Sequence, residues 1–136
     1  APVGSLLLGN KTFIHQARRV RKTWGGGMRQ AGYLAAAGLF ALQNHVDRLK
    51  EDHDMARQLE ECLSTCAWVK NVVPVETNIV IFETVESLPV EDCLKQLEDK
   101  GIKALKFGPN SIRMVCHLDI DADMINHTLS TLKKIS

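Results

Sequence analysis

The sequence predicts an α/β protein in which a helix-rich first part leads into a small α+β lobe. From residue 69 onward, short apolar runs and one amphipathic stretch follow each other in the order β-β-α-β-β-α, an order typical of a small sheet with helices on one face. Residues 28–49 contain almost no helix breaker and predict one helix that leads towards this lobe. We therefore expect two domains, residues 1–49 and 50–136.

Composition places the chain among ordinary globular proteins. Its 136 residues suffice for a real core, and 45% of them are hydrophobic against 24% charged. The formal net charge of +1 gives no global reason for binding nucleic acid or a membrane. No run approaches the roughly 20 apolar residues of a transmembrane helix. We expect neither nucleic acid nor membrane among the partners.

The first part is predicted to begin with a buried strand, Val3 to Leu8, that ends at the turn pair Gly9-Asn10. A helix is expected from Thr12 to Lys22. The helix from residue 28 is apolar nearly all round, which predicts burial. Beyond Leu42 it becomes amphipathic and charged, and a second or continuing helix is expected to end near Thr65.

The predicted lobe has four strands, each with a run of apolar or β-branched residues. They are residues 69–73, 77–83, 102–107 and 111–117. An amphipathic helix from Pro89 to Lys100 is closed by Gly101, and Gly108-Pro109-Asn110 joins the last two strands as a turn. Asp121 is expected to start the final helix.

A basic segment with three glycines is the first candidate site. Gly25 to Gly27 can adopt positive φ and bring bare backbone close to a ligand. Lys22 and Arg29 flank them, and a helix start leaves N–H groups free for an anion. Residues 1–46 carry six basic residues and no acid, against eleven basic and sixteen acidic residues in the rest. The pattern favours a small anionic ligand or an acidic partner, with a flexible turn before a core helix as the alternative.

Arg113 is the second candidate. Strand alternation places Ile112, Met114 and Cys116 on one face and Arg113 on the other, with Val115 and His117. The guanidinium suits bidentate binding of a carboxylate, although an arginine on a strand can also be an ordinary solvated residue. His117 beside Asp119 is either a base or a hydrogen-bonded structural pair, and the structural interpretation is favoured.

The remaining polar residues form no complete catalytic or metal-binding set. Cys62 and Cys66 stand four residues apart on a predicted helix, but no third ligand lies near them, so we expect no metal. The four cysteines form no Cys-x-x-Cys pair and are interpreted as scattered thiols. No Gly-x-Ser-x-Gly elbow, Walker loop or dinucleotide-binding fingerprint occurs.

Several segments resemble one enzyme family in order along the whole chain. The most specific are GGGMRQAG and the preceding ARRVRK, supported by APVGSLLLGNKTFI, LKEDHDMA, TNIVIF and IRMVCHLDID. They resemble the carboxyl-terminal portion of the low-specificity L-threonine aldolases, pyridoxal-phosphate lyases of fold type I (the aspartate aminotransferase superfamily). The resemblance implies the end of a large cofactor domain (residues 1–49), a long connecting helix and a small α+β domain (residues 50–136).

The resemblance also implies roles for the two candidate sites. Lys22 and Arg29 would contact the phosphate of pyridoxal 5'-phosphate held by a neighbouring subunit, and Arg113 would hold the α-carboxylate of the amino-acid substrate. The enzyme would cleave L-threonine or L-allo-threonine to glycine and acetaldehyde, in threonine catabolism and glycine biosynthesis. It would be a homotetramer built as a dimer of dimers. A cytoplasmic location is expected, with mitochondria as the alternative.

In one respect the sequence departs from the family. The lysine that forms the Schiff base with the cofactor belongs to a motif that would precede Ala1, and none of the ten lysines present has that context. The aspartate and histidine that contact the cofactor ring are missing as well. We therefore expect no catalytic residue in this chain and no activity of the chain alone. A non-catalytic α+β interaction module is the alternative from another functional class, and nucleic-acid binding a weaker third.

Overall fold

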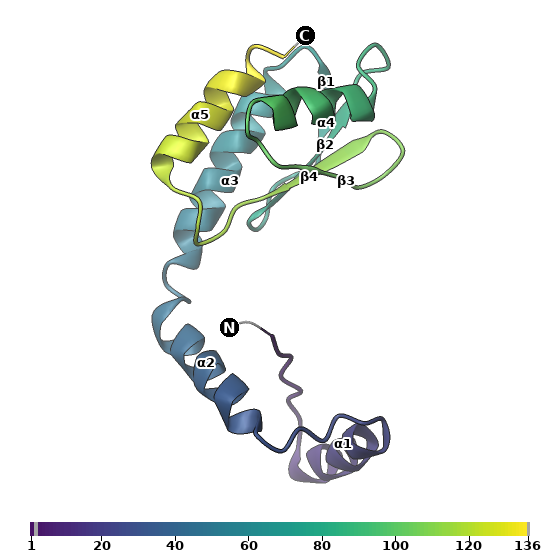
Figure 1. Ribbon diagram of the computed structural model, residues 1–136, viewed down its shortest axis with the longest axis vertical. Helices are drawn as coiled ribbons and strands as arrows, with labels where there is room; N and C mark the ends of the chain where they lie inside the picture. The colour runs from purple at the N-terminus through teal and green to yellow at the C-terminus, as the bar shows by residue number, and fades with distance from the viewer. Residues whose placement is uncertain (2, 136) are drawn as a thin grey trace. The chain divides into compact units, whose positions relative to one another are not determined.

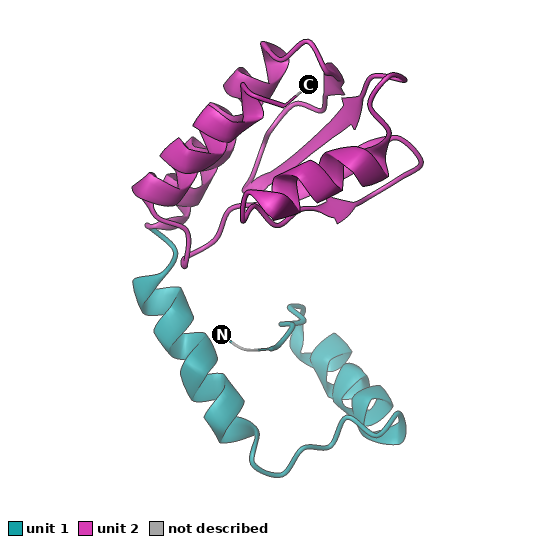
Figure 2. Cartoon of the chain, turned by 45° about the horizontal axis from the view of Figure 1, so that its top comes forward, with its two compact units in different colours: residues 1–47 teal, residues 48–136 magenta. Residues whose placement is uncertain are grey.

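The computed structural model describes residues 1 and 3–135, which form two compact units, residues 1–47 and 48–136. Figure 2 shows the two units in different colours. The predicted division at residue 49 lies two residues from this boundary, and the assignment of the first unit to a cofactor domain stays a prediction. No helix in the described part of the chain is long and apolar enough to cross a membrane.

The first unit contains two helices, α1 (Lys11–Thr23) and α2 (Ala31–Asn44). Helix α1 begins where predicted, because the side chain of Asn10 caps it by accepting a hydrogen bond from the Phe13 N–H at 2.9 Å. Neither helix contains a buried residue. The first unit therefore has no hydrophobic core of its own.

The strand predicted over Val3 to Leu8 is wrong. These residues form no strand, and Leu6 and Leu8 are 80% and 85% exposed. A strand is stabilised by pairing with a neighbour, and no strand among the described residues pairs with this segment. The burial predicted for residues 28–49 is wrong for the same reason, since nothing described covers α2, whose Tyr33 is 82% exposed.

The single helix predicted over residues 28–49 is interrupted. Helix α2 ends at Asn44, residues 45–48 form turns, and α3 (Leu49–Ser64) then begins. The last residue of α2, Asn44, and the turn residues His45, Val46 and Asp47 all have weaker helix propensity than the alanine-rich segment before them. The Asn44 side chain also donates to the Phe40 carbonyl at 2.8 Å, a local bond that competes with helix continuation.

The second unit has the predicted β-β-α-β-β-α order after α3 (Figure 1). Its remaining elements are β1 (Val69–Val72), β2 (Ile79–Thr84), α4 (Val90–Asp99), β3 (Leu105–Lys106), β4 (Ser111–Val115) and α5 (Ala122–Leu132). The sheet is antiparallel, with strand order β1-β2-β4-β3. Strand β3 has two residues, so the strand predicted over 102–107 is too long.

The caps of the lobe's helices lie where the sequence predicts them. Gly101 follows α4 with a φ of +78°, and its N–H donates to the Glu98 carbonyl while the Ile102 N–H donates to the Leu97 carbonyl. These two bonds form a Schellman motif. Asp121 caps α5 by accepting from the Met124 N–H at 2.8 Å.

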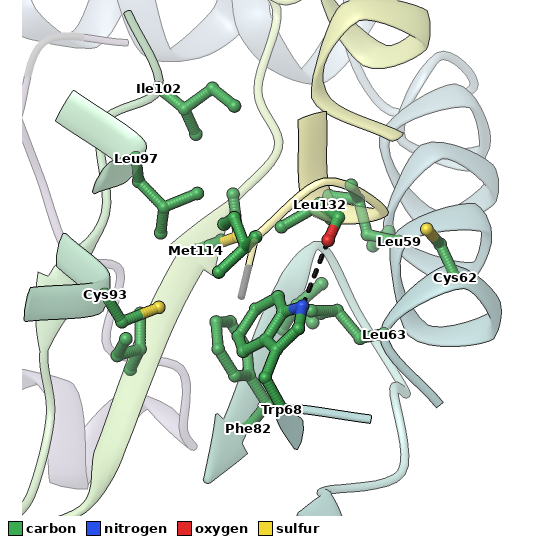
Figure 3. Packing of buried hydrophobic residues seen from close by; sticks show 14 of the residues in the cluster. Leu59, Cys62, Leu63, Trp68, Phe82, Cys93, Leu97, Ile102, Met114 and Leu132 are labelled. Atoms are coloured by element: carbon green, nitrogen blue, oxygen red, sulfur yellow. Dashed lines mark hydrogen bonds between the residues drawn. The ribbon is translucent and has the colours of Figure 1, made fainter. Parts of the chain in front are cut away.

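The core lies between one face of the sheet and the three helices α3, α4 and α5. Phe82 of β2 is fully buried there, together with Leu63 and Leu97 from the helices (Figure 3). Ile112 of β4 is fully buried as well. The Trp68 indole N–H donates to the Leu132 carbonyl at 3.0 Å, so the one polar atom of this large buried ring is satisfied. The opposite face of the sheet carries Arg113.

Candidate functional site

The three glycines end helix α1. Gly25 has a φ of +83°, its N–H donates to the Lys22 carbonyl at 3.2 Å, and the Gly26 N–H donates to the Arg21 carbonyl at 2.8 Å. This pattern is again a Schellman motif. The Gly27 N–H donates to the Gly25 carbonyl at 2.9 Å. The expectation that this loop offers free backbone donors is therefore wrong for the glycines, whose N–H groups are all used.

The glycines do make room for basic side chains. A Cβ atom on Gly27 would lie 2.8 Å from the Lys22 Nζ, and one on Gly26 would lie 2.7 Å from the Arg21 Cγ. The Lys22 ammonium thus lies over bare backbone that a larger residue would fill. The phosphate-binding role of Lys22 stays a prediction.

Arg29 lies between the glycine turn and helix α2, which begins at Ala31 and not at Met28 as predicted. It is exposed, and the Gln30 side chain makes no capping hydrogen bond. The positive end of this 14-residue helix therefore lies beside Arg29 without a side-chain acceptor. The first unit contains no acidic residue before Asp47, and no ion pair of Lys22 or Arg29 occurs within the described residues.

Arg113 occupies the middle of β4, which is an inner strand of the sheet. It pairs with Ile81 of β2 on one side and Leu105 of β3 on the other. Its neighbours Ile112 and Met114 are 0% and 6% exposed and face the core, as the alternation predicted. Arg113 therefore lies on the face of the sheet that no helix in the described part of the second unit covers.

The guanidinium of Arg113 has unused hydrogen-bonding capacity. Its Nε atom is buried and has no hydrogen-bond partner, and no carboxylate within the described residues forms an ion pair with it. The Phe107 ring lies under it, with the Cζ atom 5.9 Å from the ring centroid. A buried unpaired donor on a charged group is unfavourable without an acceptor. The surroundings of Arg113 therefore suit an anionic ligand.

His117 and Asp119 form a local turn. The Asp119 N–H donates to His117 Nδ1 at 3.3 Å, and the Asp119 carboxylate lies 3.6 Å from the same nitrogen. Both side chains are exposed. This geometry agrees with the structural interpretation.

The thiols of Cys62 and Cys66 face backbone acceptors. Cys62 Sγ donates to the Leu129 carbonyl at 3.6 Å and Cys66 Sγ to the Cys62 carbonyl at 3.3 Å. Burial raises the pKa of the Cys66 thiol, and the neighbouring Cys62 raises it further. The described residues contain no group of three potential metal ligands. Both thiols therefore contribute to the packing between α3 and α5.

Sequence reasoning missed Phe107 as part of the site. The signal was available, because residues 105, 107 and 113 fall on one face once the two strands are paired around the Gly108 turn. It was missed since the register of a hairpin cannot be fixed without the exact strand ends. Lys22 and Arg29 belong to the first unit and Arg113 to the second, so the two candidate sites lie in different units.

The fold and its similarity to solved structures define the class of protein. The structure matches that of the cystine C-S lyase C-DES, solved with its product cysteine persulfide, with a TM-score of 0.60 and 25% sequence identity, over 76% of this chain and 28% of that one. The solved structures that it resembles are enzymes of fold type I, the pyridoxal-phosphate fold. The fold class implied by the resemblance is thereby confirmed.

The sequence comparisons then identify the family. Residues 1–87 match the family model described as beta-eliminating lyase, and the chain belongs to that family. It is 40% identical over 137 residues to the low-specificity L-threonine aldolase 1 of Arabidopsis thaliana, and 40% identical over 125 residues to the low specificity L-threonine aldolase of Escherichia coli K12. These alignments include 98% and 91% of this chain but span only 38% and 36% of the two relatives.

Proposed function

We propose that this chain is the carboxyl-terminal portion of a pyridoxal-phosphate-dependent threonine aldolase, which cleaves L-threonine or L-allo-threonine to glycine and acetaldehyde. The observation that carries the proposal is Arg113, an inner-strand arginine with a buried, unpaired Nε and no carboxylate partner in the described structure. An amino-acid substrate supplies the missing acceptor as its α-carboxylate. The similarity to two named threonine aldolases supports the choice of reaction.

In this proposal Arg113 binds and orients the substrate. A guanidinium and a carboxylate form two parallel charge-assisted hydrogen bonds, and the pairing of Arg113 with both neighbouring strands fixes its backbone. Fixing the carboxylate also fixes the direction in which the Cα–Cβ bond of threonine points. Arg113 is thus a binding residue and takes no part in proton transfer.

Lys22 and Arg29 are proposed to hold the phosphate of the cofactor. The Lys22 ammonium over Gly27 and the uncapped start of α2 beside Arg29 both favour an anion. The cofactor, when bound, supplies the electron-withdrawing ring that makes cleavage next to Cα feasible. By the resemblance, the lysine that carries it lies outside these 136 residues, so the proposal expects no activity of this chain alone. A tetrameric assembly and a cytoplasmic or mitochondrial location belong to the same proposal.

The test uses the complete enzyme and three single variants. Arg113→Ala is expected to raise KM for threonine by about tenfold to a hundredfold, the loss expected for hydrogen bonds to a charged group. Arg57→Ala is the matched control, since Arg57 is an exposed arginine of the same unit whose one ion-pair partner among the described residues is Asp54. Arg29→Ala is expected to weaken cofactor binding, measured by equilibrium dialysis. Unchanged KM in Arg113→Ala would remove the substrate-binding assignment.

A second function has one observation in its favour. The first unit exposes apolar side chains throughout and contains no acidic residue before Asp47, which also suits a non-catalytic module that docks an acidic partner. Adding the amino-terminal portion of a relative separates the two functions. A complex that binds pyridoxal phosphate and absorbs visible light supports the aldolase, whereas a folded but colourless complex supports the module.

A further inference from the structure

We propose that Phe107 is a positioning residue that fixes the plane of the Arg113 guanidinium and thereby sets the affinity of the site for the substrate carboxylate. The inference rests on the proposed function of Arg113. It concerns a residue that neither the sequence motifs nor the similarity to known proteins singles out.

The register of the β3–β4 hairpin places Phe107 on the same face as Arg113. Lys106 pairs with Ile112, which is fully buried, and its ammonium forms an ion pair with Glu91 of α4. Lys106 therefore faces the helix-covered side of the sheet. Because side chains alternate along an extended chain, the next residue, Phe107, faces the opposite side, where the guanidinium of Arg113 lies.

The backbone of Phe107 is held firmly although its ring is not buried. Its N–H donates to the Ser111 carbonyl at 2.9 Å and so closes the hairpin, and the Asn110 carbonyl of the turn accepts from the Thr84 N–H at 3.1 Å. The ring is nevertheless 57% exposed. The Phe107 ring therefore contributes little to the core, and the hairpin holds its backbone beside Arg113.

The contact between the two side chains restricts the arginine. The Arg113 Cζ atom lies 5.9 Å from the Phe107 ring centroid, within the range of a cation–π interaction. Ile81 and Leu105 lie beside Arg113 on the neighbouring strands and bring no charge. With no carboxylate to orient the guanidinium, the ring is the one described group that favours a particular plane for it. A carboxylate then meets donors that already point in a fixed direction.

The test is a double-mutant cycle in the complete enzyme. Phe107→Leu is expected to raise KM for threonine about two- to fivefold, the range expected for loss of an exposed cation–π contact, with kcat unchanged. Phe107→Tyr keeps the ring and is expected to restore the wild-type KM. In the Arg113→Ala background, Phe107→Leu is expected to have no further effect, because the guanidinium that the ring orients is gone.

Phe40→Leu is the matched control. Phe40 is also 57% exposed, but its ring contacts His45 and not an arginine. Thermal unfolding of each variant checks that the fold is kept. The proposal is overturned if Phe107→Leu leaves KM unchanged, or if its effect persists undiminished in the Arg113→Ala background, since that result indicates a purely structural role.

Failure of this inference can be told apart from failure of the proposed function. If Arg113→Ala raises KM while Phe107→Leu does not, Arg113 keeps its role and Phe107 loses the one proposed here. If the complete wild-type enzyme does not cleave threonine, or Arg113→Ala leaves KM unchanged, the proposed function fails and the role of Phe107 falls with it.

Discussion

Arg113 and the buried thiols of this chain have opposite surroundings. The Arg113 guanidinium keeps an unpaired buried donor on the open face of the sheet. Cys93 and Cys116, in contrast, are 0% and 2% exposed within the core of the second unit, where burial raises the pKa of each thiol to about 11. The surroundings of Arg113 therefore suit the binding of an anion, whereas those of Cys93 and Cys116 keep both thiols neutral.

The two thiols predict a loss of stability in alkali. Because the folded pKa of Cys93 and Cys116 lies above the unfolded value of about 8.5, the folded chain retains protons that the unfolded chain releases. Their contribution is therefore fully present below about pH 8.5 and is lost as the pH rises towards 11. Urea unfolding of the chain between pH 8 and pH 11 should show a falling free energy of unfolding.

The control for this prediction is the chain with Cys93→Ala and Cys116→Ala. It should lose the part of the alkaline slope that comes from these two thiols. Identical slopes in the two chains would show that the thiols do not titrate with unfolding.

At the scale of the elements, glycine with positive φ decides where helices end. Gly25 closes α1 and Gly101 closes α4, each through the same pair of hydrogen bonds. The sequence alone indicated the role of Gly101, because it follows an amphipathic helix directly. The glycines after Trp24 were also expected to end their helix, but three consecutive glycines next to basic residues equally suggest an anion-binding loop.

The positive φ of Gly101 predicts that an alanine there destabilises the lobe. Gly101→Ala should lower the free energy of unfolding by about 1–2 kcal/mol, because a side chain is strained at a φ of +78°. Gly108→Ala is the matched control, since Gly108 lacks positive φ and its Cβ would lie 3.4 Å from the nearest atom, the Ser111 Oγ. Chemical denaturation of both variants measures the difference. Equal stability of the two variants would contradict the assigned role of Gly101.

The elements of the lobe could largely be predicted from the sequence, and those of the first unit only in part. In β4, the alternation of Ile112, Arg113 and Met114 is a local signal, and the sheet keeps it. The segment from Val3 to Leu8 carries an equally apolar signal, but a strand also needs a partner, which periodicity cannot supply. The break after Asn44 was missed because the propensities concerned are weak and the surrounding helix pattern is strong.

The residues of the candidate sites could also be predicted only in part. Arg113 was identified from one strand, and Lys22 and Arg29 from the motif around the glycines. The partner of Arg113, Phe107, depends on how two strands pair across the hairpin, which the sequence of either strand does not determine. Whether Lys22 and Arg29 bind the cofactor phosphate remains a prediction that the Arg29→Ala variant tests.

On the scale of the whole molecule, the two units differ in what holds them together. The second unit has a core of Phe82, Ile112, Leu97 and their neighbours, whereas α1 and α2 contain no buried residue. Helices of 13 and 14 residues are marginally stable in water without tertiary packing. In the chain by itself, the second unit should therefore be stable and the first unit labile.

Amide hydrogen exchange of the chain checks this prediction. Amides of α1 and α2 should exchange within seconds to minutes, while those of Val80 and Phe82 in β2 and Met114 in β4 should be the slowest, because they lie in inner strands over the core. Equal protection in both units would mean that the first unit is stabilised by contacts outside those described, such as self-association through its exposed apolar side chains.

The turn at residues 45–48 has a consequence for protein engineering. Since the lobe from Arg48 onward contains its own sheet, core and the arginine proposed to hold the substrate, this turn is a natural crossover point for chimaeras between relatives. Exchanging everything after it would transfer the proposed carboxylate-binding arginine together with its sheet, while the glycine-flanked basic segment stays with the recipient. Recombination libraries built at this junction would leave each of the two candidate sites intact within its own unit.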